Sequence, residues 1–174
     1  MKSLSLPLQK SAKALVLSLQ KHGVTTPPAA EVAFDLDVSG SFDDEHRQGQ
    51  TQQLLNRLVP WCIVFDPDHK LDVFTFSDGV GRSHHVGELT PDASEGFIAK
   101  RIIGRVPGYG NGTNYSYVLE ENLKHFGWIS TDASPKPKPK FFSRIFGSGG
   151  SDASDVSAQA PAKKRSIVLF VTDG

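Results

Sequence analysis

The stretch of sequence that indicates the fold most directly is EVAFDLDVSGS, at residues 31–41. Its first six residues are mostly apolar, which predicts a strand, and short polar side chains with one glycine follow at once. A second, unbroken apolar run lies at residues 167–171 and is followed by Thr172 and Asp173. A continuous β-branched and apolar run is typical of a strand that is covered on both faces of a parallel sheet.

The rest of the chain alternates between helix and strand patterns. Apolar side chains at helical spacing predict helices at residues 8–19, around 54–59, from Thr90 through 102, and at 115–126, with Pro60 kinking or restarting the second. Short apolar runs predict strands at 71–76 and 80–86, paired as a hairpin. This order predicts an α/β protein with a Rossmann-like, mostly parallel sheet flanked by helices.

The sequence divides into four segments. Residues 1–28 form an amphipathic helix and a linker, and residues 29–129 form the first part of the domain. Residues 130–165 are rich in Ser, Ala, Pro and Gly, which predicts a disordered, low-complexity insertion. Residues 166–174 supply the last strand. We expect the N-terminal helix to pack against the sheet, and the alternative is that it lies on a membrane surface. For the insertion, the alternative to a solvated loop is that its aromatic island at residues 141–146 docks on a partner.

Composition excludes several classes of protein. The chain has 174 residues, and its 19 basic and 19 acidic side chains give a net charge of zero, which argues against a nucleic-acid binder. Its one cysteine, Cys62, cannot form an intramolecular disulfide and is expected to be a small core residue. Apolar runs are too short for a membrane span, and lysines interrupt the N-terminal apolar stretch. We therefore expect a cytoplasmic protein.

Three polar clusters fall at predicted strand or helix ends. They are residues 37–41, 108–113 and 172–174, and their side chains offer oxygen ligands rather than Cys or His. Oxygen-only sets suit a hard cation such as Mg²⁺. Asp37, Ser39 and Ser41 alternate along a turning loop and can direct three oxygens at one point. An open position on the ion would favour an acidic side chain from a protein partner.

These residues resemble the metal-ion-dependent adhesion site of von Willebrand factor type A domains. That signature is Asp-x-Ser-x-Ser, then a distant Thr, then a distant Asp after an apolar strand, and it is matched by Asp37, Ser39, Ser41, Thr113 and Asp173. The chain is most similar to the tellurium-resistance (TerF-like) branch. The resemblance implies Mg²⁺ (or Mn²⁺) bound by the two serines and the threonine, with the aspartates acting through water. It also implies protein binding rather than catalysis, with a role in tellurium or stress resistance.

Family members usually continue after the last aspartate with two further strands. We therefore expect a fold truncated after its fourth core strand, either because the sequence is a fragment or because a partner completes the sheet. An alternative function is a Mg²⁺-dependent phosphatase of the haloacid-dehalogenase type, with Asp35 as nucleophile and Asp37 as acid/base. A third interpretation is a scaffold with an unused site. His84 and His85 are not expected to share a metal, because neighbours in a strand point to opposite faces.

Overall fold

The computed structural model describes residues 5–130 and 163–173. Four strands form one sheet in the order β3-β2-β1-β4. They are β1 (Glu31–Asp37), β2 (Leu71–Phe76), β3 (Ser83–Leu89) and β4 (Ser166–Val171). β1 pairs in parallel with both β2 and β4, whereas β3 runs antiparallel to β2. The predicted α/β class and mostly parallel sheet are confirmed, and the arrangement is consistent with a Rossmann-like fold.

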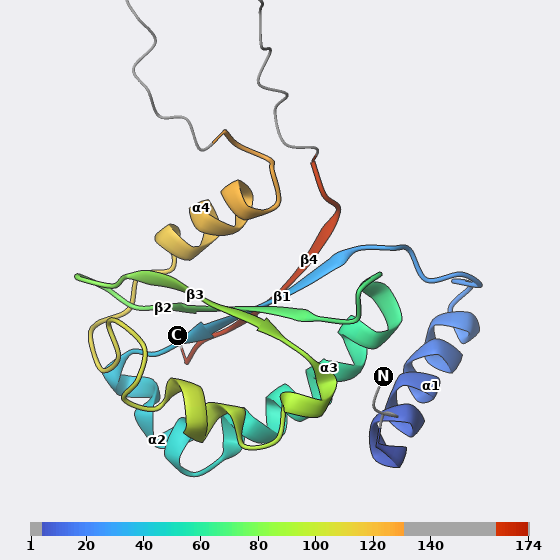
Figure 1. Cartoon of the computed structure of the whole chain (residues 1–174), viewed down its shortest axis with the longest axis horizontal. Helices are drawn as coiled ribbons and strands as arrows, with labels where there is room; N and C mark the ends of the chain where they lie inside the picture. Colours follow the sequence, from blue (N-terminus) through green and yellow to red (C-terminus); the bar gives the residue numbers. More distant parts are fainter. Residues whose placement is uncertain (1–4, 131–162, 174) are drawn as a thin grey trace, which may run out of the picture.

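Helices cover both faces of this sheet (Figure 1). One face carries α1 (Leu6–Lys21), α2 (Asp43–Arg47) and α3 (Gln50–Phe65), and the other carries α4 (Ser116–His125). Alternate residues of β1 supply the two cores. The α3 side contains Val32, Phe34 and Leu36 from β1 and Val38 directly after it, together with α3 residues that include Leu55, Val59 and Cys62. The α4 side contains Ala33, Phe74, Phe76, Val118 and Phe126.

The N-terminal helix packs against the domain. Leu8, Leu15 and Leu19 of α1 contact the core on the α3 side, as expected for the packed alternative rather than a free membrane-surface helix. Gly23 ends α1 with a φ of 85°, and the backbone N–H of Val24 donates to the carbonyl of Leu19. Among the described residues, none of the helices has the length and apolar character needed to cross a bilayer.

Two predicted elements differ from the structure. Instead of one helix from Thr90, the chain forms a 3-10 turn, η2 (Pro91–Ala93), and a π-helical turn, η3 (Ile98–Ile102). Gly96 lies between them with a φ of 67°, a left-handed conformation that interrupts a right-handed helix. The strand predicted at 80–86 begins and ends three residues later, because residues 77–82 form the hairpin turn. Helix α3 continues through Pro60 to Phe65.

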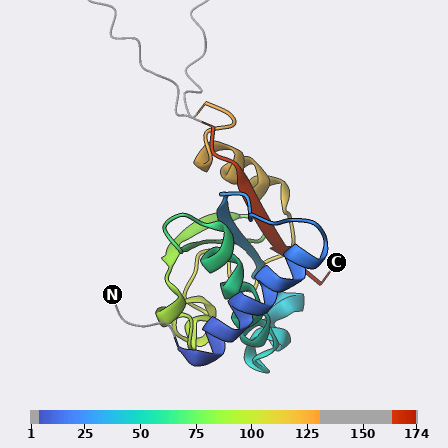
Figure 2. The same ribbon diagram turned by 90° about the vertical axis from the view of Figure 1, so that its right-hand side faces the viewer.

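The last strand lies at the edge of the sheet, beside α4 (Figures 1 and 2). Ile167, Leu169 and Val171 pack on the α3-side core. On the opposite face, Val168 and Phe170 remain 37% and 38% exposed. The expectation that both faces of this strand are covered is therefore wrong for the described residues, because α4 lies over β2 and β3 more than over β4.

Most of the predicted insertion, residues 131–162, lies outside the described residues. Its last residues are already anchored to the domain. The carbonyl of Arg165 accepts from Glu31 at 2.9 Å, and the N–H of Lys164 donates to the carbonyl of Phe126 at 2.9 Å. Pairing with β1 thus begins next to residue 166, where the last strand was predicted to start.

Candidate metal centre at the carboxyl ends of the strands

The carboxyl end of β1 presents a buried carboxylate that other segments hold in place. Asp37 is the last residue of the strand and is fully buried. Its Oδ1 accepts the backbone N–H of Ser39 at 2.8 Å, and its Oδ2 accepts the hydroxyl of Thr172 at 2.7 Å. Because β1 and β4 are parallel neighbours, their carboxyl ends meet at one edge of the sheet. Asp37 thereby connects the first polar cluster, to which it belongs, with Thr172 of the third.

The two serines of the first cluster lie side by side. The Oγ atoms of Ser39 and Ser41 are 3.2 Å apart. Ser39 is buried and Ser41 is exposed, so the pair spans the boundary between the protein interior and solvent. Two oxygens that bind one octahedral Mg²⁺ at about 2.1 Å are separated by about 3 Å. The serine hydroxyls therefore have the spacing that adjacent ligands of such an ion require.

The glycine-rich loop that precedes Thr113 packs directly on this turn. The N–H of Gly40 donates to the carbonyl of Asn111, and the N–H of Gly110 donates to the carbonyl of Val38, both at 2.8 Å. A Cβ added at Gly40 would lie 3.0 Å from the carbonyl oxygen of Gly110. The approach of the two backbones explains why a glycine occupies position 40. The loop thus supports the serine turn through two backbone hydrogen bonds.

Thr113 and Asp173 lie on the segments that reach the site, but their side chains stay outside its hydrogen bonds. Thr113 follows Gly112, whose carbonyl accepts the N–H of Asp78 at 2.7 Å, and Asp173 follows Thr172. Both side chains are exposed. Within residues 5–130 and 163–173, hydrogen bonds connect Asp37 with the Ser39 backbone and Ser39 with Ser41, and none joins the side chain of Thr113 or Asp173 to them.

His46 supports the site from α2, and the sequence analysis missed it. The residue is 2% exposed, with Nε2 2.9 Å from the carbonyl oxygen of Asp37 and Nδ1 2.9 Å from the hydroxyl of Thr51. A carbonyl only accepts, so Nε2 carries the proton and Nδ1 accepts from Thr51. Burial lowers the pKa of His46, which favours this neutral form. No local motif marks such a histidine, because its partners lie on other elements.

Asp35 lies two residues before Asp37 on the same face of β1, beneath α4. It is fully buried, and its Oδ2 accepts the amide of Asn122 at 2.5 Å. Burial raises the pKa of Asp35 to about 7, although the Asn122 hydrogen bond acts in the opposite direction. A nucleophile must reach its substrate, so the enclosure of Asp35 does not favour the phosphatase interpretation.

Searches of protein-family models, curated proteins and solved structures find no match to this chain. The assignment of the site therefore rests on the sequence pattern and on the geometry described above.

Proposed function

We propose that this protein binds a divalent cation, Mg²⁺ or Mn²⁺, and uses it to capture an acidic side chain of a protein partner. The ligand set is the one that the resemblance to von Willebrand factor type A domains implies: Asp37, Ser39, Ser41, Thr113 and Asp173. The single observation that carries the proposal is the pair of serine hydroxyls 3.2 Å apart, above the buried Asp37.

The donor set fits a hard cation. All five side chains offer oxygen, and hydroxyl ligands are neutral, so they leave the positive charge of the ion largely uncompensated. Asp37 already accepts from the Ser39 backbone and from Thr172, yet each carboxylate oxygen has a second lone pair. The exposed side of the site, at Ser41, is where a partner carboxylate would arrive. This is a binding role, and it assigns no catalytic residue.

The finer fold identity belongs to the same proposal. A von Willebrand factor type A domain of the TerF-like branch accounts for the order of the five site residues and for a strand order with β1 between β2 and β4. On this view further strands of that family would pair with β4, which is the edge strand of the sheet in the part of the chain that the structure describes. Tellurium or stress resistance is the role that the resemblance implies.

Calorimetric titration with MgCl₂ or MnCl₂ tests the metal site. We expect saturable one-to-one binding to the wild type and its loss in the Ser39→Ala/Ser41→Ala variant. The single variant Ser41→Ala should fold like the wild type, because Ser41 is exposed. We expect it to weaken Mg²⁺ binding by at least about tenfold. Ser18→Ala, an exposed hydroxyl on α1, is the matched control. Equal titrations of wild type and double variant would eliminate the site.

Binding of a partner carboxylate to the metal ion can be measured separately, with Mn²⁺ as the ion. A protein-bound Mn²⁺ that retains a water ligand enhances the relaxation of solvent protons, and a carboxylate that replaces the water reduces this enhancement. We expect a short Asp-containing peptide to reduce it and the Asn-containing peptide to leave it unchanged. If both peptides act alike, the ion does not recruit carboxylates.

A further inference from the structure

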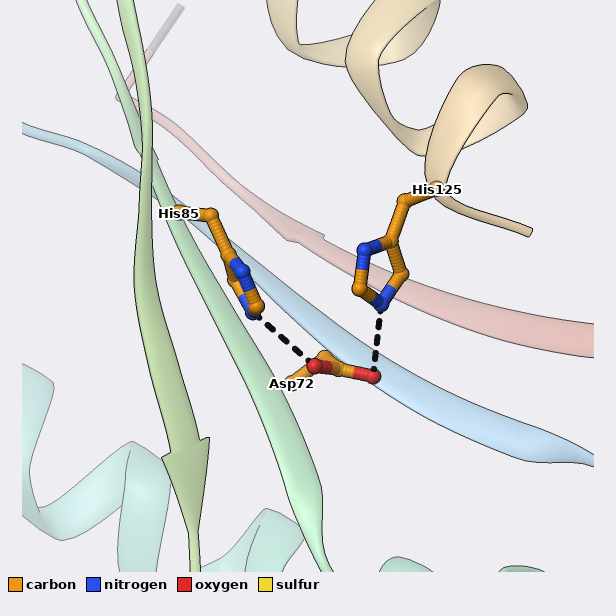
Figure 3. Close-up of side chains that lie close together, drawn as sticks. All are labelled: Asp72, His85 and His125. Carbon is orange, nitrogen blue, oxygen red and sulfur yellow. Dashed lines mark hydrogen bonds and ion pairs between the residues drawn. The ribbon is translucent and has the colours of Figure 1, made fainter. Parts of the chain in front are cut away.

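A second group of potential metal ligands lies at the other end of the sheet, on the α4 face. Asp72 of β2 faces His85 of β3 and His125, the last residue of α4 (Figure 3). The Nε2 of His85 is 2.9 Å from Oδ1 of Asp72, and the Nε2 of His125 is 3.2 Å from Oδ2. One ligand atom from each of the three residues lies within 4.8 Å of the other two. Both imidazoles therefore point at a single carboxylate.

Strand register explains how the three residues meet. Phe74 pairs with His85 across the antiparallel ladder, so their side chains share a face, and Asp72 lies two residues before Phe74 on that same face. The ladder is irregular between Val73 and Phe74, which sets this register. His84 pairs with Thr75 and faces the opposite side, as the sequence predicted for adjacent histidines.

The surroundings hold the two rings in position. The ring of His85 stacks on Phe74 with centroids 4.5 Å apart, and the ring of His125 meets the edge of Phe74 at 5.3 Å. Asp72 is only 8% exposed, whereas the side chains of His85 and His125 are each about one-third exposed, at 31% and 32%. Solvent therefore reaches this group of residues on the side of the two imidazoles, whereas the carboxylate beneath them is buried.

This donor set differs in kind from the oxygen set at the carboxyl edge. Two imidazole nitrogens and one carboxylate oxygen suit Zn²⁺, which commonly takes three protein ligands and leaves a fourth position to water. A tetrahedral Zn²⁺ with bonds of about 2.0–2.1 Å separates its ligand atoms by about 3.3 Å. The two imidazole–carboxylate distances, 2.9 Å to Oδ1 and 3.2 Å to Oδ2, are close to this separation, and all three ligand atoms lie within 4.8 Å of one another, so an ion would draw them together by about an ångström or two.

We propose that Asp72, His85 and His125 form a zinc site, with the fourth position open to water or a small ligand. Each imidazole presents an unprotonated Nε2 to the ion, so its proton moves to Nδ1 or to solvent. The site joins the C-terminal end of α4 to two strands, and metal binding stabilises the folded state by mass action. It is separate from the proposed Mg²⁺ site: Asp37 pairs with Phe76, four residues or roughly 13 Å along β2 from Asp72.

Competition with a chromophoric zinc chelator tests the site on the full chain after removal of metals. We expect one tightly held Zn²⁺ per chain, and a visible Co²⁺ spectrum typical of low-coordinate nitrogen and oxygen ligation. Loss of a residue that merely orients a metal ligand costs about 10- to 100-fold in affinity, so we expect His125→Gln and Asp72→Asn to cost at least tenfold. His84→Gln is the matched control and should retain wild-type affinity.

Measurements of folding separate the loss of a metal ligand from the loss of the folded structure. His125 ends a helix and is partly exposed, so His125→Gln should keep the wild-type circular dichroism in EDTA while losing the rise in Tm that Zn²⁺ gives the wild type. Ser39→Ala/Ser41→Ala should still bind Zn²⁺, which keeps this result independent of the Mg²⁺ proposal. Absence of stoichiometric binding in the wild type, or equal affinity in the His84 and His125 variants, would overturn the assignment.

Discussion

The hydroxyl of Thr172 donates to Oδ2 of Asp37 at 2.7 Å and joins two residues 135 positions apart in the chain. The bond links the carboxyl ends of β1 and β4, the two strands that carry the first and last polar clusters. Asp37 is fully buried, so each hydrogen bond to its carboxylate compensates for lost hydration. This contact joins side chains of the first and third polar clusters directly.

Thr172→Val should therefore destabilise the protein. Valine keeps the branched shape but leaves one carboxylate oxygen of Asp37 without this donor, at a cost of about 1–3 kcal/mol. The free energy of unfolding, measured with urea in EDTA, reports the loss. Thr113→Val is the control: Thr113 is exposed and its hydroxyl makes no hydrogen bond within the described ranges, so we expect a change below about 0.5 kcal/mol. Equal stabilities of the two variants would show that the Thr172 bond contributes nothing.

The contact between the serine turn and the glycine-rich loop predicts a different sensitivity. In Gly40→Ala, the new methyl group would lie 3.0 Å from the carbonyl oxygen of Gly110, so the loop must move. We expect a loss of about 1–3 kcal/mol in unfolding free energy and weaker Mg²⁺ binding, because Thr113 follows this loop. Gly112→Ala places its methyl group 3.5 Å from Cβ of Asp78, an ordinary contact, and serves as the matched control. A Gly40→Ala protein that titrates like Gly112→Ala would contradict the proposed role of the loop.

The sheet was predictable because its strands are continuous apolar runs with clear ends. Residues 71–76 form a strand as predicted, and residues 31–36 and 167–171 form strands to within one residue. The region after Thr90 could not be predicted in this way, because a strong helix start is followed by Gly96 in a left-handed conformation. Local start signals carry no information about such an interruption.

The residues of the candidate sites likewise include some that the sequence predicted and others that it did not. Asp37, Ser39 and Ser41 lie within five consecutive residues, so their grouping could be inferred from spacing. His46 acts on a backbone carbonyl nine residues away, which no spacing rule anticipates. The proposed zinc ligands come from β2, β3 and α4, and they meet through the register of Phe74 with His85 and the packing of α4 on the sheet. The sequence predicted that His84 and His85 point to opposite faces, which the register confirms, but it could not identify the residues that face His85.

The buried pair of Asp35 and Asn122 predicts a pH-dependent stability. Burial raises the folded-state pKa of Asp35 to about 7, above its ordinary value of 3.8. The unfolded chain therefore releases the proton first as the pH rises, so the stabilisation is fully present below about pH 4 and is lost as the pH approaches 7. Asn at this position has no proton to lose and can still pair with the Asn122 amide.

Asp35→Asn should accordingly be more stable than wild type at pH 8, by about 2–4 kcal/mol, and the difference should shrink on acidification towards pH 4. Urea unfolding in EDTA across this range measures it. Asp44→Asn, an exposed carboxylate, should follow the wild-type curve to within about 0.5 kcal/mol. A wild-type protein that gains stability on passing from pH 4 to 7 relative to Asp35→Asn would show that Asp35 is ionised when folded.

Cys62 offers a chemical probe of the core. Its thiol is fully buried in α3 and donates to the carbonyl of Val59 at 3.0 Å. Burial raises the pKa of the thiol to about 12, and the nearby charges of Asp66 and Asp68 act in the same direction. Since the thiolate is the reactive form, native protein at pH 8 should resist a disulfide reagent such as dithionitrobenzoate. We expect labelling at least about a thousandfold slower than in urea, as opening of the core then limits the reaction. Ser18→Cys in a Cys62→Ala background, exposed on α1, should label at once, and equally fast labelling of native Cys62 would mean that the α3 core opens readily.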